Sequence, residues 1–424
     1  MCHINNIQNN LFSCNSVDTI YLDYSKAFDK VDHRILLKKL ELYGITNEYL
    51  QWLKSFITGR NQFVFVNNES SYHSEVTSGV PQGSVLGTVL FIISINDLPN
   101  HIKHSNILTF ADDTKIVLPI NSMDDNILLQ SDLNSVMAWS NENNMQLNKN
   151  KFELLVHKQT TNSANLRLLE QLPFFQLPLM YEVSEDIYIS PSLSVKDLGI
   201  TITPDLTWEN HIYNICKSST KISAWILNIF HSREKNVMLT LFNSLVRSKL
   251  EYCCQLWNPF KIKHIDAIEQ IQRKFTRKIQ HMSHHDYWTR LKLLDIMSLQ
   301  RRREKAIIIL VWKIKNNKTP NDINLEFKIN SRNSETKAVV KPMAKSKGKI
   351  QTSYENSLVI KSAKIWNKLP FKLTETSNFL LFKNKLEKYL NYFPDEPPVH
   401  GYFHKSKNSL LDYQALSYET VFQL

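Results

Sequence analysis

The pattern of apolar residues changes at Pro204, and this change constrains the fold more than any other feature of the chain. Before it, short β-branched and aromatic runs alternate with helical patterns, as in a sheet with packed helices. After it, apolar residues recur at helical spacing over Glu209–Phe230, Lys235–Leu250, Ile262–Gln280 and Ile296–Ile314. We therefore expect an α+β chain in which a mixed sheet with helices precedes a helical domain.

The first 204 residues contain the strands and helices of this expected sheet. Six segments are rich in β-formers and predict strands: Thr19–Tyr24, Gln62–Val66, Tyr72–Val76, Phe152–Val156, Ile187–Ile189 and Val195–Thr203. Local signals also mark helices: Asp32 is a capping residue before a helix that runs to Tyr43, a second helix spans Asn47–Thr58, and Ser122 with Asp125 has the spacing of a capping box.

Two acidic motifs carry the candidate chemistry. Asp23 follows a predicted strand, and Asp112-Asp113 forms a predicted turn between strands Ile107–Ala111 and Thr114–Leu118. Carboxylates at the ends of rigid strands suit a site that grips two divalent cations during phosphoryl transfer. A solvated turn is the alternative, since aspartate is a common turn former.

Glycine is scarce in this chain, and three of its few glycines lie close together. Only 8 glycines occur in 424 residues, yet Gly79, Gly83 and Gly87 fall within nine positions, just before a long apolar helix that ends near Asn96. Such a cluster indicates a sharp bend or a close approach of the backbone. It fits either a nucleotide or template strand at a helix N-terminus or a tightly packed turn.

Composition limits the classes of protein to which the chain can belong. The net charge of +11 and 42% hydrophobic content favour a folded protein with a polyanionic partner. The longest apolar run, Val85–Ile95, is too short to span a bilayer, and the first 20 residues have no signal-peptide pattern. We expect a soluble intracellular protein with reduced thiols, without a membrane partner, from these features and the five scattered cysteines.

Five motifs in order resemble the reverse transcriptases of non-LTR, LINE-type retrotransposons, including the jockey-like elements. They are Tyr21–Asp29, Ser78–Gly87, Phe110–Asp113, Trp139 with Met145–Asn148 and Lys151, and Leu198-Gly199. The resemblance implies a polymerase palm with an antiparallel sheet and packed helices, followed by an all-helical thumb-like domain. It also implies RNA-directed DNA synthesis from an RNA template, a DNA primer and deoxynucleoside triphosphates.

The same resemblance assigns roles to individual residues. Asp23, Asp112 and Asp113 would hold two Mg²⁺ ions, or Mn²⁺, and Lys151 or its neighbour Lys149 would protonate the leaving pyrophosphate. Three further residues would face the incoming nucleotide or template: Phe28, which would exclude a 2′-hydroxyl, Gln82 and Gly83. In the helical part, a basic amphipathic segment would follow the phosphate backbone through Arg273, Lys274, Arg277 and Lys278. Arg301, Arg302 and Arg303 form a second basic cluster; a solvated helix face is the alternative for both clusters.

The resemblance also predicts the domain organisation. We expect an N-terminal remnant at 1–18, the palm at 19–204, a helical thumb and connection at 205–315, a basic flexible linker at 316–349 and a small C-terminal region at 350–424. Only 22 residues precede Asp23, too few for the fingers region of such polymerases, so we expect an N-terminally truncated chain. Two alternatives follow: an inactive remnant that binds nucleic acid or a protein partner, and a two-metal nuclease.

Overall fold

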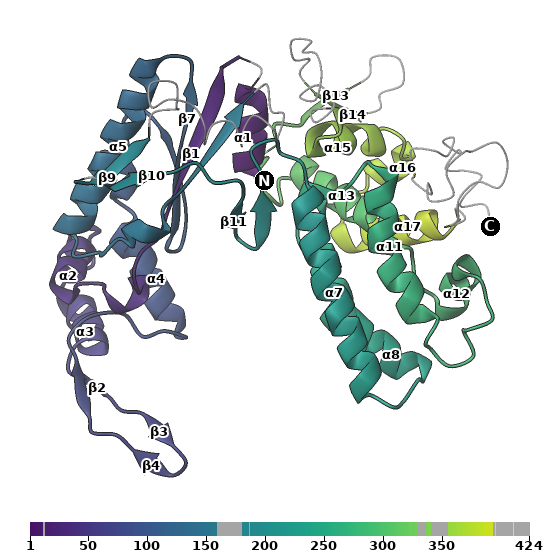
Figure 1. Ribbon diagram of the computed structural model, residues 1–424, viewed down its shortest axis with the longest axis horizontal. Coiled ribbons are helices and arrows are strands. Elements are labelled where there is room, and N and C mark those ends of the chain that lie inside the picture. The colour runs from purple at the N-terminus through teal and green to yellow at the C-terminus, as the bar shows by residue number, and fades with distance from the viewer. Residues whose placement is uncertain are drawn as a thin grey trace. The chain divides into compact units, whose positions relative to one another are not determined.

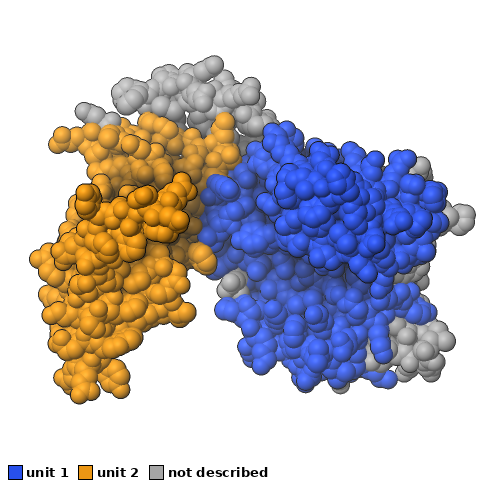
Figure 2. Space-filling view, turned by 90° about the horizontal axis from the view of Figure 1, so that it is seen from below, with its two compact units in different colours: residues 1–8, 196–424 blue, residues 9–195 orange. Residues whose placement is uncertain are grey.

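The computed structural model describes residues 1–11, 13–158, 180–185, 187–321, 323–329, 336–340, 355–392, 395 and 410. The chain divides into two compact units, which Figure 2 colours separately. Unit 2 consists of Asn9–Val195, and unit 1 consists of Met1–Gln8 with Lys196–Leu424. The first helix, α1 (Cys2–Asn10), crosses this division near its end. The expected palm boundaries at 19 and 204 therefore differ from those of unit 2 by about ten residues.

Unit 2 is organised around a four-stranded antiparallel sheet with the strand order β6-β7-β1-β8. Figure 1 labels its two inner strands, β1 and β7. The strands are β1 (Ser16–Leu22), β6 (Asn106–Phe110), β7 (Asp113–Ile120) and β8 (Glu153–Lys158). Six of the seven residues of β1 are buried, as expected of a strand paired on both edges. This sheet and its helices confirm the mixed architecture predicted for the first half of the chain.

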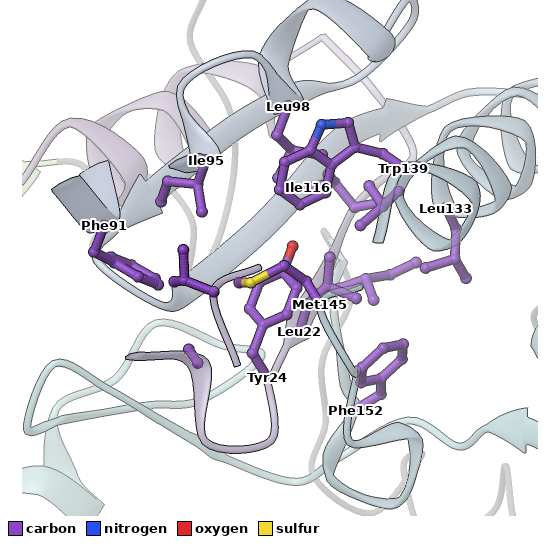
Figure 3. Close-up of a cluster of buried hydrophobic side chains, with 14 of the residues drawn as sticks. Leu22, Tyr24, Phe91, Ile95, Leu98, Ile116, Leu133, Trp139, Met145 and Phe152 are labelled. Atoms are coloured by element: carbon purple, nitrogen blue, oxygen red, sulfur yellow. The ribbon is translucent and has the colours of Figure 1, made fainter. Parts of the chain in front are cut away.

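Helices cover the sheet of unit 2 and enclose one core. They are α2 (His33–Leu42), α3 (Asn47–Ile57), α4 (Val85–Ile95) and α5 (Met123–Glu142), with single turns η1 (Ala27–Asp29), η2 (Leu98–His101) and η3 (Lys149–Lys151). Figure 3 shows the centre of this core, where the ring of Tyr24 and the thioether of Met145 lie beside Leu22. Phe91 enters from α4 and Trp139 from α5, and both are buried.

The predicted helix starts are confirmed. Asp32 accepts hydrogen bonds from the backbone N–H of Arg34 at 2.8 Å and of Ile35 at 3.2 Å, so it caps α2. Ser122 and Asp125 form a complete capping box at the start of α5. These signals succeed because each cap involves residues that are only three positions apart.

Two hairpins of unit 2 differ in detail from the prediction. The segment around Asn67-Asn68 forms two short ladders, β2 (Arg60–Gln62) with β5 (Ser74–Val76) and β3 (Phe65–Val66) with β4 (Glu69–Ser70). A further hairpin joins β9 (Tyr181–Ser184) to β10 (Ile187–Ile189), and the sequence predicted only its second strand. Tyr181 donates a hydrogen bond to the buried Asp18 at 2.8 Å, which ties β9 to the central strand.

Unit 1 is mainly helical, and its long segment begins within a tight hairpin, β11 (Val195–Asp197) with β12 (Ile200–Ile202). Its helices are α7 (Glu209–Ile229), α8 (Lys235–Leu241), η4 (Phe242–Arg247, a π-helix), α9 (Ser248–Glu251), α10 (Cys254–Trp257), α11 (Ile262–Thr276), α12 (Tyr287–Leu294) and α13 (Leu299–Lys315). The predicted helix Lys235–Leu250 is therefore interrupted by a π-helical segment. Helix α12 was not predicted.

The C-terminal part of unit 1 packs on α13 in one hydrophobic cluster. This cluster joins α13 to α15 (Leu358–Trp366), α16 (Phe371–Thr374) and α17 (Phe379–Tyr392). The predicted flexible linker 316–349 contains a hairpin, β13 (Glu326–Ile329) with β14 (Thr336–Val339), and Ala338 is buried in the cluster. The predicted linker therefore contains a hairpin, while β11–β12 falls in the segment Val195–Thr203 that the sequence predicts as a strand. Residues 330–335 and 341–349 lie outside the described residues.

None of the helices in the described ranges is both long enough and apolar enough to cross a membrane.

Candidate active site

Strand register brings the three predicted carboxylates to one end of the sheet of unit 2. In the β1–β7 pair, Leu22 lies opposite Thr114, so Asp23 and Asp113 are the next residues along the two strands. In antiparallel strands, the Cα atoms of residues directly opposite each other lie about 4.5–5.5 Å apart. Asp112 lies in the turn between β6 and β7 and directly precedes Asp113. All three aspartates therefore lie at the same end of the sheet, where β1 ends and β7 begins.

The hairpin turn is shifted by one residue from the predicted position. Phe110 pairs with Asp113, so the two turn residues are Ala111 and Asp112, and Asp113 is the first residue of β7. Ala111 adopts a left-handed φ of 52° at the first turn position. The shift arises because Asp113 gains a strand partner in Phe110. It leaves Asp112 half-buried at the tip and Asp113 exposed.

Lys151 pairs with the first of these carboxylates. Its Nζ lies 3.2 Å from Asp23 Oδ2. The backbone N–H of Asn148 donates to Asp23 O at 2.8 Å, which fixes the start of η3 beside the end of β1. Lys149, the alternative proton donor, is exposed. The sequence thus identified a lysine that reaches the carboxylate site, although 128 residues separate it from Asp23.

The donor chemistry at this edge fits divalent cations of the Mg²⁺ class. Carboxylate oxygens are their preferred protein ligands, and the ammonium of Lys151 already occupies a cation-binding position on Asp23. In the part of the chain that the structure describes, no three His, Cys, Asp or Glu side chains are gathered closely enough to hold a metal ion. The three aspartates thus lie at one end of the sheet, and their side chains would have to turn toward one another to hold a metal ion.

The glycine-containing loop lies directly against the η1 turn. Gly79 donates its N–H to Val31 O at 2.8 Å, and Val80 donates to Phe28 O at 2.9 Å. Gly79 has a φ of +84°, and a Cβ there would approach the backbone of Asp29 to 2.7 Å. A side chain at this position is therefore excluded on two grounds. At Gly87, in the first turn of α4, a Cβ would lie 2.2 Å from the carbonyl oxygen of Pro81.

The two side chains predicted to face the nucleotide are each held by a neighbour. Phe28 is half-buried and stacks on Phe91, with 4.1 Å between ring centroids and 16° between ring planes. Gln82 is exposed and donates from Nε2 to Asp29 Oδ1 at 3.0 Å. Gly83 is also exposed, and its φ is +80°. All these residues belong to one part of unit 2, between η1 and α4.

Two residues that the sequence analysis did not assign hold the Gly79 carbonyl. His33 Nε2 and Arg60 Nη2 each donate to Gly79 O at 2.8 Å. Arg60 also donates from Nε to Ile57 O at 2.9 Å, which links the base of the β2–β5 hairpin to α3. His33 is buried, and its Nε2 is engaged in this contact. Neither residue has a local sequence signal, because the shared acceptor is distant in sequence.

The predicted basic segment of unit 1 is only partly a free cationic surface. Helix α11 ends at Thr276, so Arg277 and Lys278 lie beyond its last residue rather than within a helix that runs to Gln280. They are exposed, as is Lys274. Arg273 is half-buried, and its guanidinium lies 4.7 Å from the ring centroid of Tyr287.

The second predicted basic cluster is structural. Arg301 and Arg303 are buried, with 1% and 0% of their surface exposed, inside unit 1. Arg302 forms an ion pair with Glu251. Neither a solvated helix face nor a phosphate-binding surface therefore describes this cluster. Charged residues in succession favour exposure in general, but here neighbouring helices enclose them.

The Leu198-Gly199 turn is contacted by Tyr252, the residue that directly follows α9. Both turn residues have positive φ, 46° and 82°, as a two-residue hairpin turn of type I′ requires. Tyr252 donates its hydroxyl to Leu198 O at 3.0 Å, and its ring lies 3.6 Å from the position of a Cβ on Gly199. Tyr252 had no assigned role in the sequence analysis.

Comparisons with known proteins find a family match that covers most of unit 2 and the first residues of the long segment of unit 1. Residues 15–202 match the family described as reverse transcriptase (RNA-dependent DNA polymerase). The chain is 28% identical over 279 residues to the RNA-directed DNA polymerase from the mobile element jockey of Drosophila melanogaster, which covers 61% of this chain and 28% of that protein. It is 27% identical over 274 residues to the probable RNA-directed DNA polymerase from transposon X-element of the same organism. This match covers 63% of this chain and 28% of that protein. The chain thus spans 28% of the length of these curated relatives.

Among solved structures, apo telomerase from Candida tropicalis is similar with a TM-score of 0.38 and 11% identity, over 71% of this chain and 50% of that one.

Proposed function

We propose that this chain carries the catalytic part of an RNA-directed DNA polymerase, because residues 15–202 match the reverse transcriptase family and the relatives named above are described as RNA-directed DNA polymerases of mobile elements. The observation that carries the proposal is the register of β1 and β7, in which Leu22 lies opposite Thr114, so that Asp23 and Asp113 are the adjacent residues at the same end of the two strands, inside the matched region. The substrates would be an RNA template, a DNA primer with a free 3′ hydroxyl and deoxynucleoside triphosphates.

Asp23, Asp112 and Asp113 are the residues proposed to hold two Mg²⁺ ions, or Mn²⁺. When bound, such ions neutralise phosphate charge and stabilise the attacking and leaving oxygens. The carboxylates would provide the oxygen ligands, and the rigid ends of β1 and the β6–β7 hairpin would fix their spacing. Phosphoryl transfer depends mainly on such positioning and charge neutralisation.

Lys151 is proposed to deliver a proton to the pyrophosphate leaving group. Its ion pair with Asp23 holds the ammonium at the carboxylate edge of the sheet. A lysine in this place can act as a general acid, a role that typically contributes about 100-fold or more to the rate. Lys149 belongs to the same η3 turn and is the natural comparison.

Phe28, Gln82 and Gly83 are proposed to receive the incoming nucleotide. The aromatic ring of Phe28 is held in place by its stack on Phe91. The 2′-hydroxyl of a ribonucleotide would be directed against this ring and would be excluded by its size. In unit 1, Lys274, Arg277 and Lys278 are proposed to contact phosphates of the template or primer, since exposed cations supply this attraction. Arg273 would contribute less, because it packs on Tyr287.

Primer extension tests the proposal. Full-length protein with an RNA template, a labelled DNA primer, Mg²⁺ and deoxynucleotides should extend the primer, and Asp112→Ala should abolish the product. The matched control is Asp124→Ala, which removes an exposed carboxylate from the first turn of α5 and should leave extension intact. If the wild type shifts primer–template in a salt-dependent manner but makes no product, the chain is a nucleic-acid-binding remnant and the polymerase proposal fails.

A further inference from the structure

Two segments that are about fifty residues apart in sequence form one rigid frame in unit 2. Residues 28–31 accept three hydrogen bonds from residues 78–80 through backbone oxygens. These are Gly79 N to Val31 O at 2.8 Å, Val80 N to Phe28 O at 2.9 Å and Ser78 Oγ to Asp29 O at 2.8 Å. A shift of one segment relative to the other would break several hydrogen bonds at once.

The frame is held from both sides. The absent side chain of Gly79 lets its Cα approach Asp29 closely, because a Cβ would lie 2.7 Å from Asp29 Cα and 2.8 Å from Asp29 O. On the other side, His33 and Arg60 both donate to the Gly79 carbonyl. Phe28 and Gln82 are thus carried by segments that cannot slide past each other.

The side chain of Asp29 connects this frame to Gln82, which is proposed to bind the nucleotide. Its Oδ1 accepts a hydrogen bond from Gln82 Nε2 at 3.0 Å. A carboxylate can only accept, so it fixes which end of the Gln82 amide faces it. The amide nitrogen is engaged with Asp29, and the carbonyl oxygen Oε1 is then the group that can accept a hydrogen bond from a ligand.

We propose that Asp29 is a positioning residue that orients the Gln82 amide, so that Gln82 presents an acceptor to a donor group of the incoming nucleotide. The donor would be a sugar hydroxyl or a base N–H. This inference rests on the proposed polymerase function for its ligand and on the Asp29–Gln82 contact for its geometry. Asp29 itself acts through Gln82 and contacts no reacting atom.

Paired substitutions test the orientation by its chemistry. Asp29→Ala frees the amide, and we expect the KM for the deoxynucleotide to rise about fivefold to tenfold, with kcat changed less than about twofold. Asp29→Asn keeps a neutral acceptor, which binds more weakly than a carboxylate, so KM should rise only about twofold to threefold.

Exchange of the two groups gives the sharper result. Gln82→Glu places two carboxylates together and should raise KM at least about tenfold. In the double variant Asp29→Asn with Gln82→Glu, the amide of residue 29 can donate to the new carboxylate, and KM should return to within about threefold of wild type. A smaller fraction of folded protein would lower the apparent kcat and leave KM unchanged, so a rescue of KM reports the orientation of residue 82. If the double variant is as impaired as Gln82→Glu, or if Asp29→Ala leaves KM unchanged, Asp29 does not orient Gln82.

A spectroscopic measurement separates this inference from the polymerase proposal. In full-length protein labelled with ¹⁵N-glutamine, the side-chain amide signal of Gln82 is assigned by its loss in Gln82→Ala. Its chemical shift should change in Asp29→Asn, because the carboxylate acceptor is lost, and should stay the same in the control Asp124→Asn. If the wild type does not extend primers but the signal changes in Asp29→Asn alone, the polymerase proposal fails and the Asp29–Gln82 orientation stands. A signal that is the same in Asp29→Asn and in the wild type refutes the orientation, whatever the activity.

Discussion

Substitution of Gly79 by alanine should destabilise unit 2 far more than the same change at Gly83. The left-handed backbone of Gly79 costs an alanine about 1–2 kcal/mol. Its new Cβ would also lie 2.7–2.8 Å from the backbone of Asp29 and Phe28, too close to be tolerated without movement. Movement would break the hydrogen bonds of Gly79 to Val31 and of Val80 to Phe28, each with a net contribution of about 1 kcal/mol. The expected loss is about 3–4 kcal/mol.

Gly83→Ala is the matched control for this loss. Gly83 has nearly the same φ, +80°, but a Cβ there would meet no atom within 4 Å. Only the conformational cost remains, so the expected loss is about 1–2 kcal/mol. Hydrogen exchange at the amides of β1, read by mass spectrometry, reports the free energy of opening of the unit 2 sheet. Equal losses for the two variants would show that the close approach of the loop to Asp29 does not stabilise the unit.

Three further predictions concern proton transfer, nucleic-acid binding and acid stability. Lys151→Ala should lower kcat for nucleotide incorporation about 100-fold, while Lys149→Ala should change it less than about twofold; similar losses would remove Lys151 as the proton donor. Alanine at Lys274, Arg277 and Lys278 together should weaken the salt dependence of primer–template binding. The slope of log binding constant against log salt concentration should become shallower by about 0.9 for each lost phosphate contact. The control Lys383→Ala, at an exposed lysine on α17, should leave this slope unchanged. Burial of Asp132 opposes its ionisation, but hydrogen bonds from the backbone N–H groups of Lys103, Ser105 and His104 outweigh burial and lower its pKa below 3.8. Its contribution to stability is therefore present above pH 3.8 and is lost as the pH falls below that value toward the folded-state pKa, so Asp132→Asn should weaken the acid dependence of unit 2 unfolding followed by circular dichroism. An unchanged acid dependence would contradict the assignment.

Features set by neighbouring residues were predictable from the sequence. The cap at Asp32 and the capping box of Ser122 with Asp125 depend on backbone groups within one helical turn. The turn at Asn67-Asn68 depends on two residues that tolerate positive φ, here 51° and 66°. In the candidate site, the same locality explains why Asp23, Asp112 and Asp113 could be proposed from short motifs, since each motif lies at the end of a strand.

Features set by distant partners were not predictable. The turn between β6 and β7 is displaced by one residue because Asp113 pairs with Phe110. Arg303 is buried by surrounding helices, although its place in a run of three arginines favours exposure. Arg60 acquires its role only because the chain brings Gly79 to it from a position 19 residues away. A short sequence motif therefore predicts local structure, such as a cap or a turn. It does not predict which distant residue will contact a side chain, because tertiary packing determines that contact.

The most direct test of the central proposal is single-turnover incorporation of one deoxynucleotide into a DNA primer on RNA templates that differ only in the templating base. Full-length wild-type protein with Mg²⁺ is predicted to add the nucleotide complementary to each RNA base, and Asp23→Ala is predicted to add none. The absence of templated addition by the wild type, or its persistence in Asp23→Ala, would contradict the assignment of the β1 sheet edge as the polymerase site.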